Sequence, residues 1–374
     1  MEYWEQADCH SLLFQFEESW ICNNFKKQME IKKIQDAEVE GKRVLLRVDF
    51  NAAIEKGTVK EKFKIKAADE TLRYLLGMNA KVALITHLGR PEGKVNSEFS
   101  LDPIRDDVEY ILGVKVKFVP DCVGEKVIEA MDSLSEREVV LLENVRFYAG
   151  EEENDEVFAK ELSEGFDLFV NDAFSVSHRD QASVTGVTKF LPSYAGLRLQ
   201  KEIEEMEKVK NNFERPAVAV IGGAKIETKI PVIKFFEEKY DHVLVGGKIA
   251  NEAIDQKLDF SEKVVLPTDF IDDRLDIGVD TIGRFQEIIS EAKTVVWNGP
   301  LGKFEDPRYA TGSNEMTKAI IESSAYRVVG GGETLELLEK FDAMDKVSFV
   351  STGGGAMLSY LGGEKMPGIE ALEA

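Results

Sequence analysis

Paired or triple glycines end four strand-like runs in the second half of the chain. They are Gly222–Gly223, Gly246–Gly247, Gly330–Gly332 and Gly353–Gly355. Glycine lets the backbone approach a ligand closely, and the free N–H groups at the start of a following helix attract phosphate. One such turn says little, since helix caps also use glycine, but four in one half predict a nucleotide or another phosphate ligand. The sequence patterns GxxxxGK(S/T) and GxGxxG are absent, which excludes an ordinary P-loop and a dinucleotide fingerprint.

The stretch "VVGGGETLELLEKF", residues 328–341, places a carboxylate directly after three glycines. The glycines follow a strand-like run and precede an amphipathic helical pattern, so a phosphate is expected at the helix start. Glu333 is itself an anion and would repel that phosphate. A divalent cation between the carboxylate and the phosphate resolves the conflict. The spacing therefore predicts a divalent metal beside the nucleotide.

Lys225 and Lys229 in "GGAKIETK" follow the first glycine pair and are four residues apart. On a helix this spacing puts both ammonium groups on one face, where they could reach phosphate oxygens. A solvated lysine pair is the alternative.

Asn298 and Glu305 flank "GPLG" after another strand-like run, and a carboxylate such as Glu305 suits ribose hydroxyls. Simple surface charge is the alternative for Glu305.

Arginines follow separate strand-like runs in the first half of the chain. Arg90, Arg146 and Arg179 each stand after a different run, and His87 accompanies the first of them. The planar guanidinium fork binds carboxylate and phosphate through two parallel hydrogen bonds. Salt bridges to the many acidic residues are the alternative for any one arginine, and a structural role is the alternative for His87. Their shared placement at strand ends favours a pocket for a small polyanion.

Ligands of open α/β sheets bind beyond the carboxyl ends of the strands, which is where both sets of residues stand. The first half therefore suits a small anionic metabolite, and the second half suits a nucleotide. A phosphoryl group that passes between them needs positioning and charge neutralisation more than it needs a base. A carboxylate acceptor is already ionised at neutral pH. The sequence shows no catalytic triad, and this chemistry requires none.

Short β-branched runs alternate with amphipathic helical patterns along the chain, and such alternation predicts parallel sheets covered by helices. The strand-like runs span residues 43–50, 81–88, 114–119, 138–145, 167–172, 217–223, 242–247, 294–299, 326–332 and 346–354. Helical patterns lie between them, for example at 69–78, 154–165 and 311–324. The predicted fold class is α/β, with two open parallel-sheet (Rossmann-like) domains joined by a hinge helix within residues 191–216.

Length, charge and cysteine content limit the class of protein. A chain of 374 residues, 43% of them hydrophobic, is long enough for two domains. The net charge of −22 argues against general binding to nucleic acid or to an anionic membrane, and no apolar run reaches membrane-spanning length. The three cysteines, Cys9, Cys22 and Cys122, form no disulfide framework, which favours a reducing, cytoplasmic location.

Residues 1–28 fit poorly with the regular pattern that begins at Met29. They begin acidic and lack both a basic n-region and a small-residue cleavage site, so they do not resemble a signal peptide. An extra helix, a disordered arm and an upstream start are the alternatives. If this stretch served a scaffold or interaction function instead of catalysis, its deletion should abolish partner binding and spare catalysis.

As a set, the motifs resemble those of the phosphoglycerate kinase family, in family order across residues 29–374. They read "RVDFN", "THLGRP", "LLENVRFYAGEEEND", "FVNDAFSVSHRDQAS", "GGAKIETKI", "VVWNGPLGKFE", "VGGGET" and "VSTGGGAMLSYLGGEKMPGIEAL". The resemblance implies reversible phosphoryl transfer between ATP and 3-phosphoglycerate, giving ADP and 1,3-bisphosphoglycerate with Mg²⁺, in glycolysis and gluconeogenesis. It also implies a monomer with two similar-sized domains that close about a hinge.

The resemblance implies a division of the chain into five parts. They are an N-terminal extension at 1–28, a 3-phosphoglycerate-binding domain at 29–194, a hinge helix at 195–212, a nucleotide-binding domain at 213–360 and a C-terminal segment at 361–374 that returns to the first domain.

Site residues carry over by motif. The residues implied for 3-phosphoglycerate are Asp49, Phe50, Asn51, Lys64, His87, Leu88, Gly89, Arg90, Arg146 and Arg179. The residues implied for the nucleotide are Gly222, Gly223, Lys225, Lys229, Gly247, Asn298, Glu305, Gly331, Gly332, Glu333 and Thr334, with Glu333 as the Mg²⁺ ligand. The residues implied for catalysis are Lys64, Lys229, Gly354 and Gly355. Lys229 would neutralise the moving phosphoryl group, and the glycines would present a helix N-terminus to it.

The chain departs from the family pattern at two charged positions. In "EKFKI", Lys64 stands where the family has a catalytic arginine, so the charge is kept but the bidentate fork is lost. Glu333 stands where the family has an aspartate and is one methylene longer. "RVDFNAA" also lacks a proline that often follows this asparagine, for which only a local loop change is expected. These departures leave open a catalytically weakened homologue that only binds nucleotide or metabolite.

Overall fold

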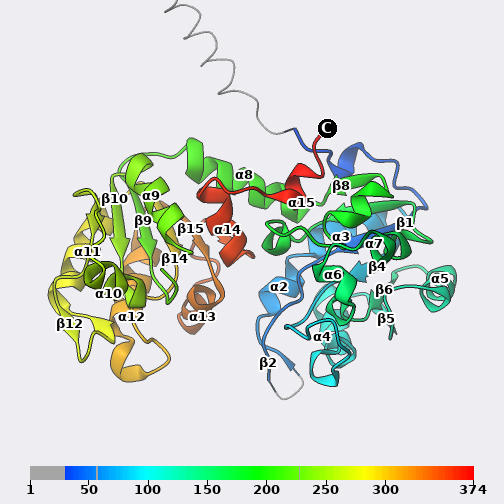
Figure 1. Ribbon diagram of the computed structural model, residues 1–374, viewed down its shortest axis with the longest axis horizontal. Helices are drawn as coiled ribbons and strands as arrows, with labels where there is room; N and C mark the ends of the chain where they lie inside the picture. The colour runs from blue at the N-terminus through cyan, green and yellow to red at the C-terminus, as the bar shows by residue number, and fades with distance from the viewer. Residues whose placement is uncertain (1–29, 56–57, 227) are drawn as a thin grey trace, which may run out of the picture.

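The computed structural model describes residues 30–55, 58–226 and 228–374, and the extension expected at 1–28 lies outside these residues. Two six-stranded sheets form the framework, one in each half of the chain (Figure 1). The first sheet has the order β5 (Lys115–Val119), β6 (Glu138–Leu142), β4 (Lys81–Ile85), β1 (Arg43–Arg47), β7 (Leu168–Asn171) and β8 (Ser193–Ala195). The second has the order β11 (Val264–Val265), β10 (His242–Val245), β9 (Ala217–Ile221), β14 (Thr294–Asn298), β15 (Tyr326–Gly330) and β16 (Phe349–Ser351).

Neighbouring strands of both sheets pair in parallel register, for example β1 with β4 and β9 with β14. Their central strands are buried along most of their length, as expected for sheets that are covered on both faces. The predicted fold class is therefore confirmed. The strands β8 and β11 were not predicted, because runs of three and two residues are too short to give a periodic signal.

Helices cover the two faces of each sheet (Figure 1). Those of the first half are α2 (Lys62–Lys66), α3 (Asp69–Gly77), α4 (Arg105–Leu112), α5 (Glu125–Asp132), α6 (Ala149–Glu152) and α7 (Glu156–Ser163). Those of the second half are α9 (Ile230–Lys239), α10 (Gly247–Asp255), α11 (Val279–Glu291), α12 (Thr311–Glu322), α13 (Gly332–Lys340) and α14 (Gly354–Leu361). Two short antiparallel hairpins, β2 (Ile54–Glu55) with β3 (Thr58–Val59) and β12 (Phe270–Ile271) with β13 (Asp276–Ile277), lie outside the main sheets.

Short 3₁₀ helices complete the connections. They are η1 (Ile34–Asp36), η2 (Ser97–Phe99), η3 (Asp102–Ile104), η4 (Val145–Phe147), η5 (Phe174–Val176), η6 (Gly186–Lys189) and η7 (Pro307–Tyr309). Within the described residues, no helix combines the length and the apolar character that crossing a membrane requires.

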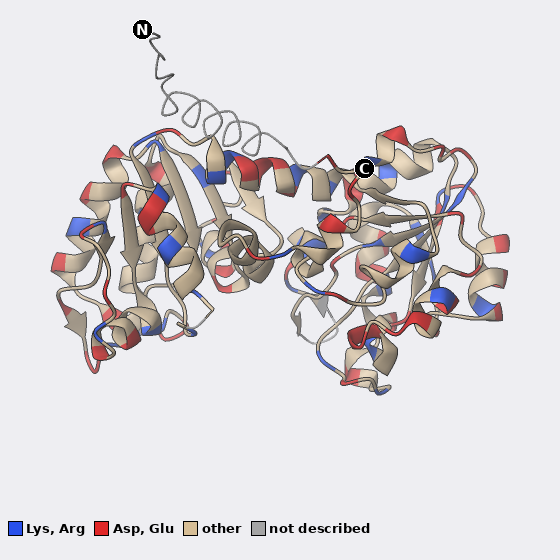
Figure 2. Ribbon diagram, turned by 45° about the horizontal axis from the view of Figure 1, so that its top comes forward, with Lys and Arg blue, Asp and Glu red and all other residues tan. Residues whose placement is uncertain are grey.

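The helix α8 (Leu197–Asn211) connects the two halves (Figure 1). It buries an apolar stripe that includes Leu199, Met206 and Val209, while its other face carries many charged residues (Figure 2). Its first N–H groups are capped from the first half of the chain. Thr71 Oγ1 accepts a hydrogen bond from Leu197 N at 2.9 Å, and Asp172 Oδ1 accepts one from Leu199 N at 3.1 Å. The start of α8 is therefore fixed to the first half of the chain, at α3 and at the end of β7.

The C-terminal residues pack on the first half of the chain, where the helix α15 (Pro367–Glu370) lies beside the start of α8 (Figure 1). Gly368 N donates to Ser177 O at 2.9 Å, and Gly368 O accepts from Asn171 Nδ2 at 3.1 Å. Lys32 N donates to Leu372 O at 2.8 Å. The chain therefore crosses between the halves a second time, between α14 and α15, in addition to the crossing through α8.

Candidate active site

A cavity of about 670 Å³ lies between the carboxyl ends of the two sheets and is lined from both halves. The predicted site residues that line it are Asp49, Asn51, Lys64, His87, Gly89, Arg90, Arg146, Arg179, Gly222, Gly223, Lys225, Lys229, Asn298, Gly331, Gly332, Glu333, Thr334, Gly354 and Gly355. The arginines, His87 and Gly89 come from the first half, and the other glycines, Glu333, Lys225 and Lys229 come from the second. One cavity thus combines the predicted metabolite site and the predicted nucleotide site.

Four predicted site residues do not line this cavity, as far as the described residues define it: Phe50, Leu88, Gly247 and Glu305. Phe50 and Leu88 are buried in the core of the first half. Other residues line the cavity that were not among the predicted site residues, namely Ser175, Val176, His178, Ala224, Thr228, Gly299, Leu335, Thr352, Gly353 and Leu358. Most of them adjoin a predicted residue in the same loop, and that adjacency is the signal that could have identified them.

The surroundings of Arg146 suit the binding of an anion. Its side chain is almost fully buried, and Nη1 donates to Gly89 O at 2.9 Å. Nη2 is buried and has no hydrogen-bond partner among the described residues. Burial and the positive charges of Arg179 and Arg47 lower the Arg146 pKa to about 10. A bound anion would satisfy the free donor and offset the mutual repulsion of the guanidinium groups.

His87 is held in one tautomer by a buried arginine. Arg47, fully buried in β1, places Nη2 at 3.2 Å from His87 Nδ1. Because a guanidinium can only donate, Nδ1 accepts this hydrogen bond and the ring proton lies on Nε2. Burial and the charges of Arg47, Arg146 and Arg179 lower the His87 pKa well below its usual value. The ring therefore stays neutral and offers one N–H donor.

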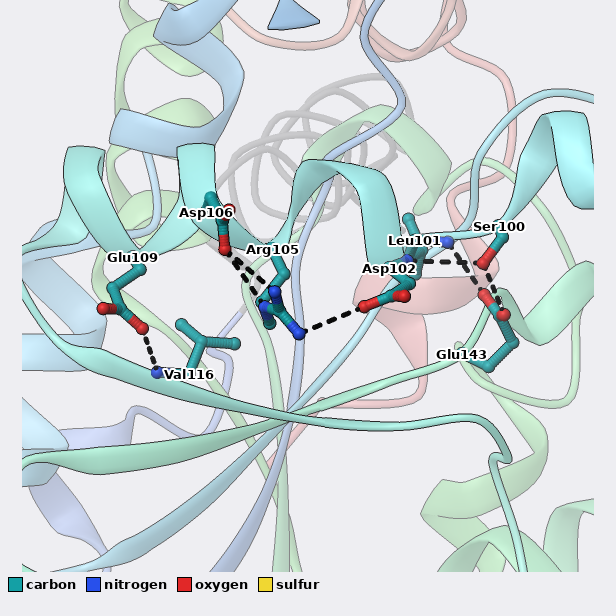
Figure 3. A network of polar contacts seen from close by, with 8 residues as sticks. All are labelled: Ser100, Leu101, Asp102, Arg105, Asp106, Glu109, Val116 and Glu143. Atoms are coloured by element: carbon teal, nitrogen blue, oxygen red, sulfur yellow. Dashed lines mark hydrogen bonds and ion pairs between the residues drawn. The ribbon is translucent and has the colours of Figure 1, made fainter. Parts of the chain in front are cut away.

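Polar contacts at the end of β6 fix the loop that carries His87. Glu143 accepts hydrogen bonds from Ser100 Oγ and Leu101 N, both at 2.8 Å (Figure 3). The next residue, Asn144, donates from Nδ2 to Leu88 O at 2.7 Å and accepts from Leu88 N at 3.2 Å. Leu88 thus supports the site through its backbone and not through its side chain.

Lys64 lies on α2 and lines the cavity. Its Nζ donates to Asn51 O at 2.7 Å and pairs with Glu61 at 3.0 Å. Asn51 Oδ1 in turn accepts from Gly89 N at 2.9 Å. The lysine that replaces the arginine of the family pattern is therefore anchored to the loop that also holds Gly89.

The prediction that Lys225 and Lys229 share a helix face is wrong. Both lysines lie before α9, which begins at Ile230 with Pro231 in its first turn. Proline favours the first turn of a helix because it has no N–H to donate and a fixed φ, so the helix starts here and not at the glycines. Lys229 Nζ contacts Asn298 Oδ1, whereas Lys225 is exposed. Burial lowers the Lys229 pKa to about 8, and the Glu333 carboxylate partly opposes that shift.

Two helix N-termini meet at the part of the cavity that the second half lines. Gly331, with φ of +103°, precedes α13, and Gly354 opens α14. A Cβ atom on Gly354 would lie 2.6 Å from Gly331 Cα, so only glycine permits this approach. Asn298 Nδ2 donates to Gly330 O at 2.9 Å, and Thr334 Oγ1 accepts from Gly299 N at 2.7 Å. Backbone N–H groups of both helices are thus available to anionic groups in the cavity.

Glu333 lies in the first turn of α13, exposed to the cavity. Partial burial and the neighbouring carboxylate of Glu305 raise its pKa, while Lys229 opposes the rise. The described residues contain no cluster of three or more His, Cys, Asp or Glu side chains that could hold a metal ion. Mg²⁺ needs no such cluster when it binds one or two carboxylates together with substrate phosphates and waters. A single carboxylate at this place is therefore compatible with Mg²⁺ held jointly by the protein and a phosphate ligand.

Comparisons with known proteins identify the family of this chain. The family model described as "Phosphoglycerate kinase" matches residues 34–258 and 253–364. A phosphoglycerate kinase of Finegoldia magna is 41% identical over 393 aligned residues, covering 92% of this chain and all of that protein. One of Pelotomaculum thermopropionicum is 40% identical, covering 92% of this chain and 99% of that protein.

Solved structures give the same result. The crystal structure of phosphoglycerate kinase from Pyrococcus horikoshii OT3 has a TM-score of 0.82 at 31% identity, covering 91% of this chain and 98% of that chain. The phosphoglycerate kinase structure from Coxiella burnetii has a TM-score of 0.75 at 31% identity, covering 92% and 99%. By sequence and by fold, the chain belongs to the phosphoglycerate kinase family of phosphotransferases.

Proposed function

We propose that the cavity binds 3-phosphoglycerate on its arginine side and ATP or ADP on its glycine side. The γ-phosphoryl group of ATP then passes reversibly to the substrate carboxylate, giving 1,3-bisphosphoglycerate and ADP in glycolysis or gluconeogenesis. The observation that carries this proposal is the single cavity lined by both sets of residues. The weakened, binding-only alternative gains no support, since Lys64 and Glu333 both line the cavity and both keep the charge of the family pattern.

On the metabolite side, Arg90, Arg146 and Arg179 would hold the phosphate of the substrate, and His87 would donate from Nε2. Asp49 and Asn51 would contact the remaining polar groups, with Gly89 supplying backbone. Phe50 and Leu88 would act only by shaping the loops: Phe50 N donates to Thr86 Oγ1 at 2.9 Å, and Asn144 holds Leu88.

On the nucleotide side, the phosphates would meet Lys225, Lys229 and the backbone at the start of α13. The glycines and polar residues that support this placement are Gly222, Gly223, Gly247, Asn298, Gly331, Gly332 and Thr334, and Glu305 is proposed for the ribose. Glu333 would hold Mg²⁺, which when bound neutralises phosphate charge.

During transfer the substrate carboxylate needs no base, because it is already ionised. Lys64 from the first half and Lys229 from the second would neutralise the charge that builds on the phosphoryl oxygens. The N-terminus of α14, at Gly354 and Gly355, would add backbone N–H donors. Lys64 keeps the charge of an arginine at this place but offers only a point contact.

We also propose a cytoplasmic monomer without nucleic-acid or membrane partners. The net charge of −22 supports the absence of nucleic-acid and anionic-membrane partners. The division at 29–194, 195–212, 213–360 and 361–374 is proposed for the working domains. The second connection through α15 supports closure of the two halves about α8 as linked bodies.

The placement of the two substrates is tested by binding each one alone. Arg179→Ala is expected to weaken 3-phosphoglycerate binding by about tenfold or more and to leave Mg-ADP binding within about twofold, because a lost charged hydrogen bond costs roughly 1.5–3 kcal/mol. Lys225→Ala is expected to give the reverse pattern. Isothermal titration calorimetry on both variants measures the four affinities. Equal weakening of both ligands in either variant would show that the assignment of sides is wrong.

The role of Glu333 is tested through Mg²⁺ dependence. Glu333→Ala is expected to raise the Mg²⁺ concentration for half-maximal turnover by about 10–100-fold, as loss of groups at metal sites commonly does. Glu336→Ala is the matched control, because Glu336 lies on the same exposed helix and influences the Glu333 carboxyl electrostatically. A Mg²⁺ profile of the Glu333→Ala protein that overlays the wild type would remove Glu333 as the ligand.

A further inference from the structure

Arg198, in the first turn of α8, contacts both halves of the chain at once. Its Nε and Nη2 donate to Glu202 Oε1 at 3.1 and 2.8 Å, and Nη2 also donates to Val350 O at 2.5 Å. Its Cζ lies 5.4 Å from the ring centroid of Phe63 and 4.8 Å from that of Phe349. With its side chain only 15% exposed, the guanidinium is fixed by hydrogen bonds and by ring contacts.

The two rings belong to different halves. Phe349 opens β16 in the second sheet, while Phe63 lies on α2 in the first half. Phe63 nevertheless packs against the hydrophobic core of the second half, in the cluster that includes Val350. Contact between α2 and the second half is therefore made both by the Phe63 ring itself and through the Arg198 side chain.

Both Phe63 and Glu202, the partners of Arg198, lie next to groups that are proposed to act on the phosphoryl group. Phe63 directly precedes Lys64, whose ammonium group is anchored at Asn51 in the cavity. At the other end, Glu202 Oε1 accepts from Thr352 N at 2.7 Å and from Thr352 Oγ1 at 2.8 Å. Thr352 lies just before the start of α14 at Gly354. Arg198 and Glu202 thus hold, from one helix, the two elements that present Lys64 and the α14 N-terminus.

We propose that Arg198 is a positioning residue that couples the placement of Lys64 to that of the α14 N-terminus across the cavity. This inference rests on the proposed function, in which both groups act on the moving phosphoryl group. Transfer requires the groups of both halves in register, and a misplacement of about 1 Å can cost about 10²-fold in rate. Each substrate alone needs only one half, so loss of the coupling affects turnover and leaves separate binding intact.

The chemistry of the contact explains the need for arginine. The planar guanidinium stacks on aromatic rings while its fork donates to the Glu202 carboxylate and to the Val350 carbonyl. A lysine could keep the charge but could not hold these partners simultaneously. Arg198→Lys therefore keeps the charge and removes the planar fork, whereas Arg198→Met removes both.

In the test, Arg198→Met and Arg198→Lys are expected to lower kcat by about 10–100-fold, with the calorimetric affinities for 3-phosphoglycerate and for Mg-ADP each within about twofold of wild type. Phe63→Leu is expected to lower kcat in the wild-type background and to have little further effect in Arg198→Met, because the two residues act as one unit. Lys201→Met is the control on the same helix, where Lys201 pairs with Glu204 and Glu205 away from the cavity, and it should retain kcat.

Wild-type turnover in the same assay tests the proposed function, while the ratio of variant to wild type tests this inference. A kcat of both Arg198 variants within twofold of wild type overturns the proposal. So does a kcat loss matched by equal loss of both separate affinities, or additive effects of Phe63→Leu and Arg198→Met. Circular dichroism melts of all variants identify any loss of kcat that follows from unfolding. If Arg198→Met is unfolded, the folded Arg198→Lys variant supplies the comparison.

Discussion

Replacing Lys229 with alanine is expected to lower kcat by about 10²–10³-fold, the usual effect of removing one preorganised group that stabilises transition-state charge. The Lys229 ammonium group is held by Asn298 in a partly buried position on the cavity wall. Burial has already lowered its pKa to about 8, so its charge is weakly solvated and available to a phosphoryl group. Steady-state kinetics with ATP and 3-phosphoglycerate measure the loss.

Lys318→Ala is the control for this substitution, because Lys318 pairs with Glu315 on the exposed surface of α12. It should leave kcat within about twofold, as surface ion pairs contribute little. If Lys229→Ala kept more than a tenth of the wild-type kcat, neutralisation by Lys229 would not be a main part of the transfer step.

The pH dependence provides a second measure of the same lysine. Above pH 8 the Lys229 ammonium group loses its proton in the free protein, so kcat/KM for ATP is expected to fall as the pH rises through this value. Below pH 8 the Lys229 side chain is protonated, and its titration should cause no change in kcat/KM for ATP. In Lys229→Ala this descending limb should be missing. A wild-type profile that is flat up to pH 9.5 would contradict the assignment.

Replacing Arg146 with alanine is expected to raise KM for 3-phosphoglycerate by about 100-fold, because a lost hydrogen bond between charged groups costs roughly 2–3 kcal/mol. Nη1 is anchored at Gly89 O, and the buried Nη2 lacks a partner among the described residues. Arg146→Lys keeps the charge but cannot make both contacts, so an intermediate rise is expected. Initial rates against 3-phosphoglycerate concentration give these values.

Arg105→Ala is the matched control, since its guanidinium pairs with Asp102 and Asp106 at the surface of the same half (Figure 3). Its KM should stay within about twofold of wild type. A larger effect on KM for ATP than on KM for 3-phosphoglycerate in Arg146→Ala would mean that the two substrates occupy the opposite sides of the cavity.

The fold and the cavity could be predicted because both rest on local patterns. The central parallel strands are mostly apolar runs that are buried along most of their length, and ligand groups collect beyond their carboxyl ends. The arginines and glycines at those ends therefore meet in one cavity. The short edge strands β8 and β11 carry no such pattern. They are strands because they pair with the neighbouring strands β7 and β10, and their own sequences do not predict this.

Other features depend on contacts between distant segments. The helix expected at Lys225 and Lys229 begins later, where Pro231 favours the first turn. The His87 tautomer is set by Arg47, forty positions earlier in the chain, through a hydrogen bond that no spacing rule reveals. In the sequence, Arg198 is one of many charged residues of a polar helix, and only the structure places Phe63 and Phe349 beside it.

The most direct test of the central claim is the steady-state phosphorylation of 3-phosphoglycerate by ATP, coupled to reduction of the product, with and without Mg²⁺. Turnover that requires both substrates and Mg²⁺ is the predicted result, and it would show that Lys64 and Glu333 are tolerated departures from the family pattern. A folded protein that binds both substrates but gives no turnover would contradict the claim and identify a binding protein instead.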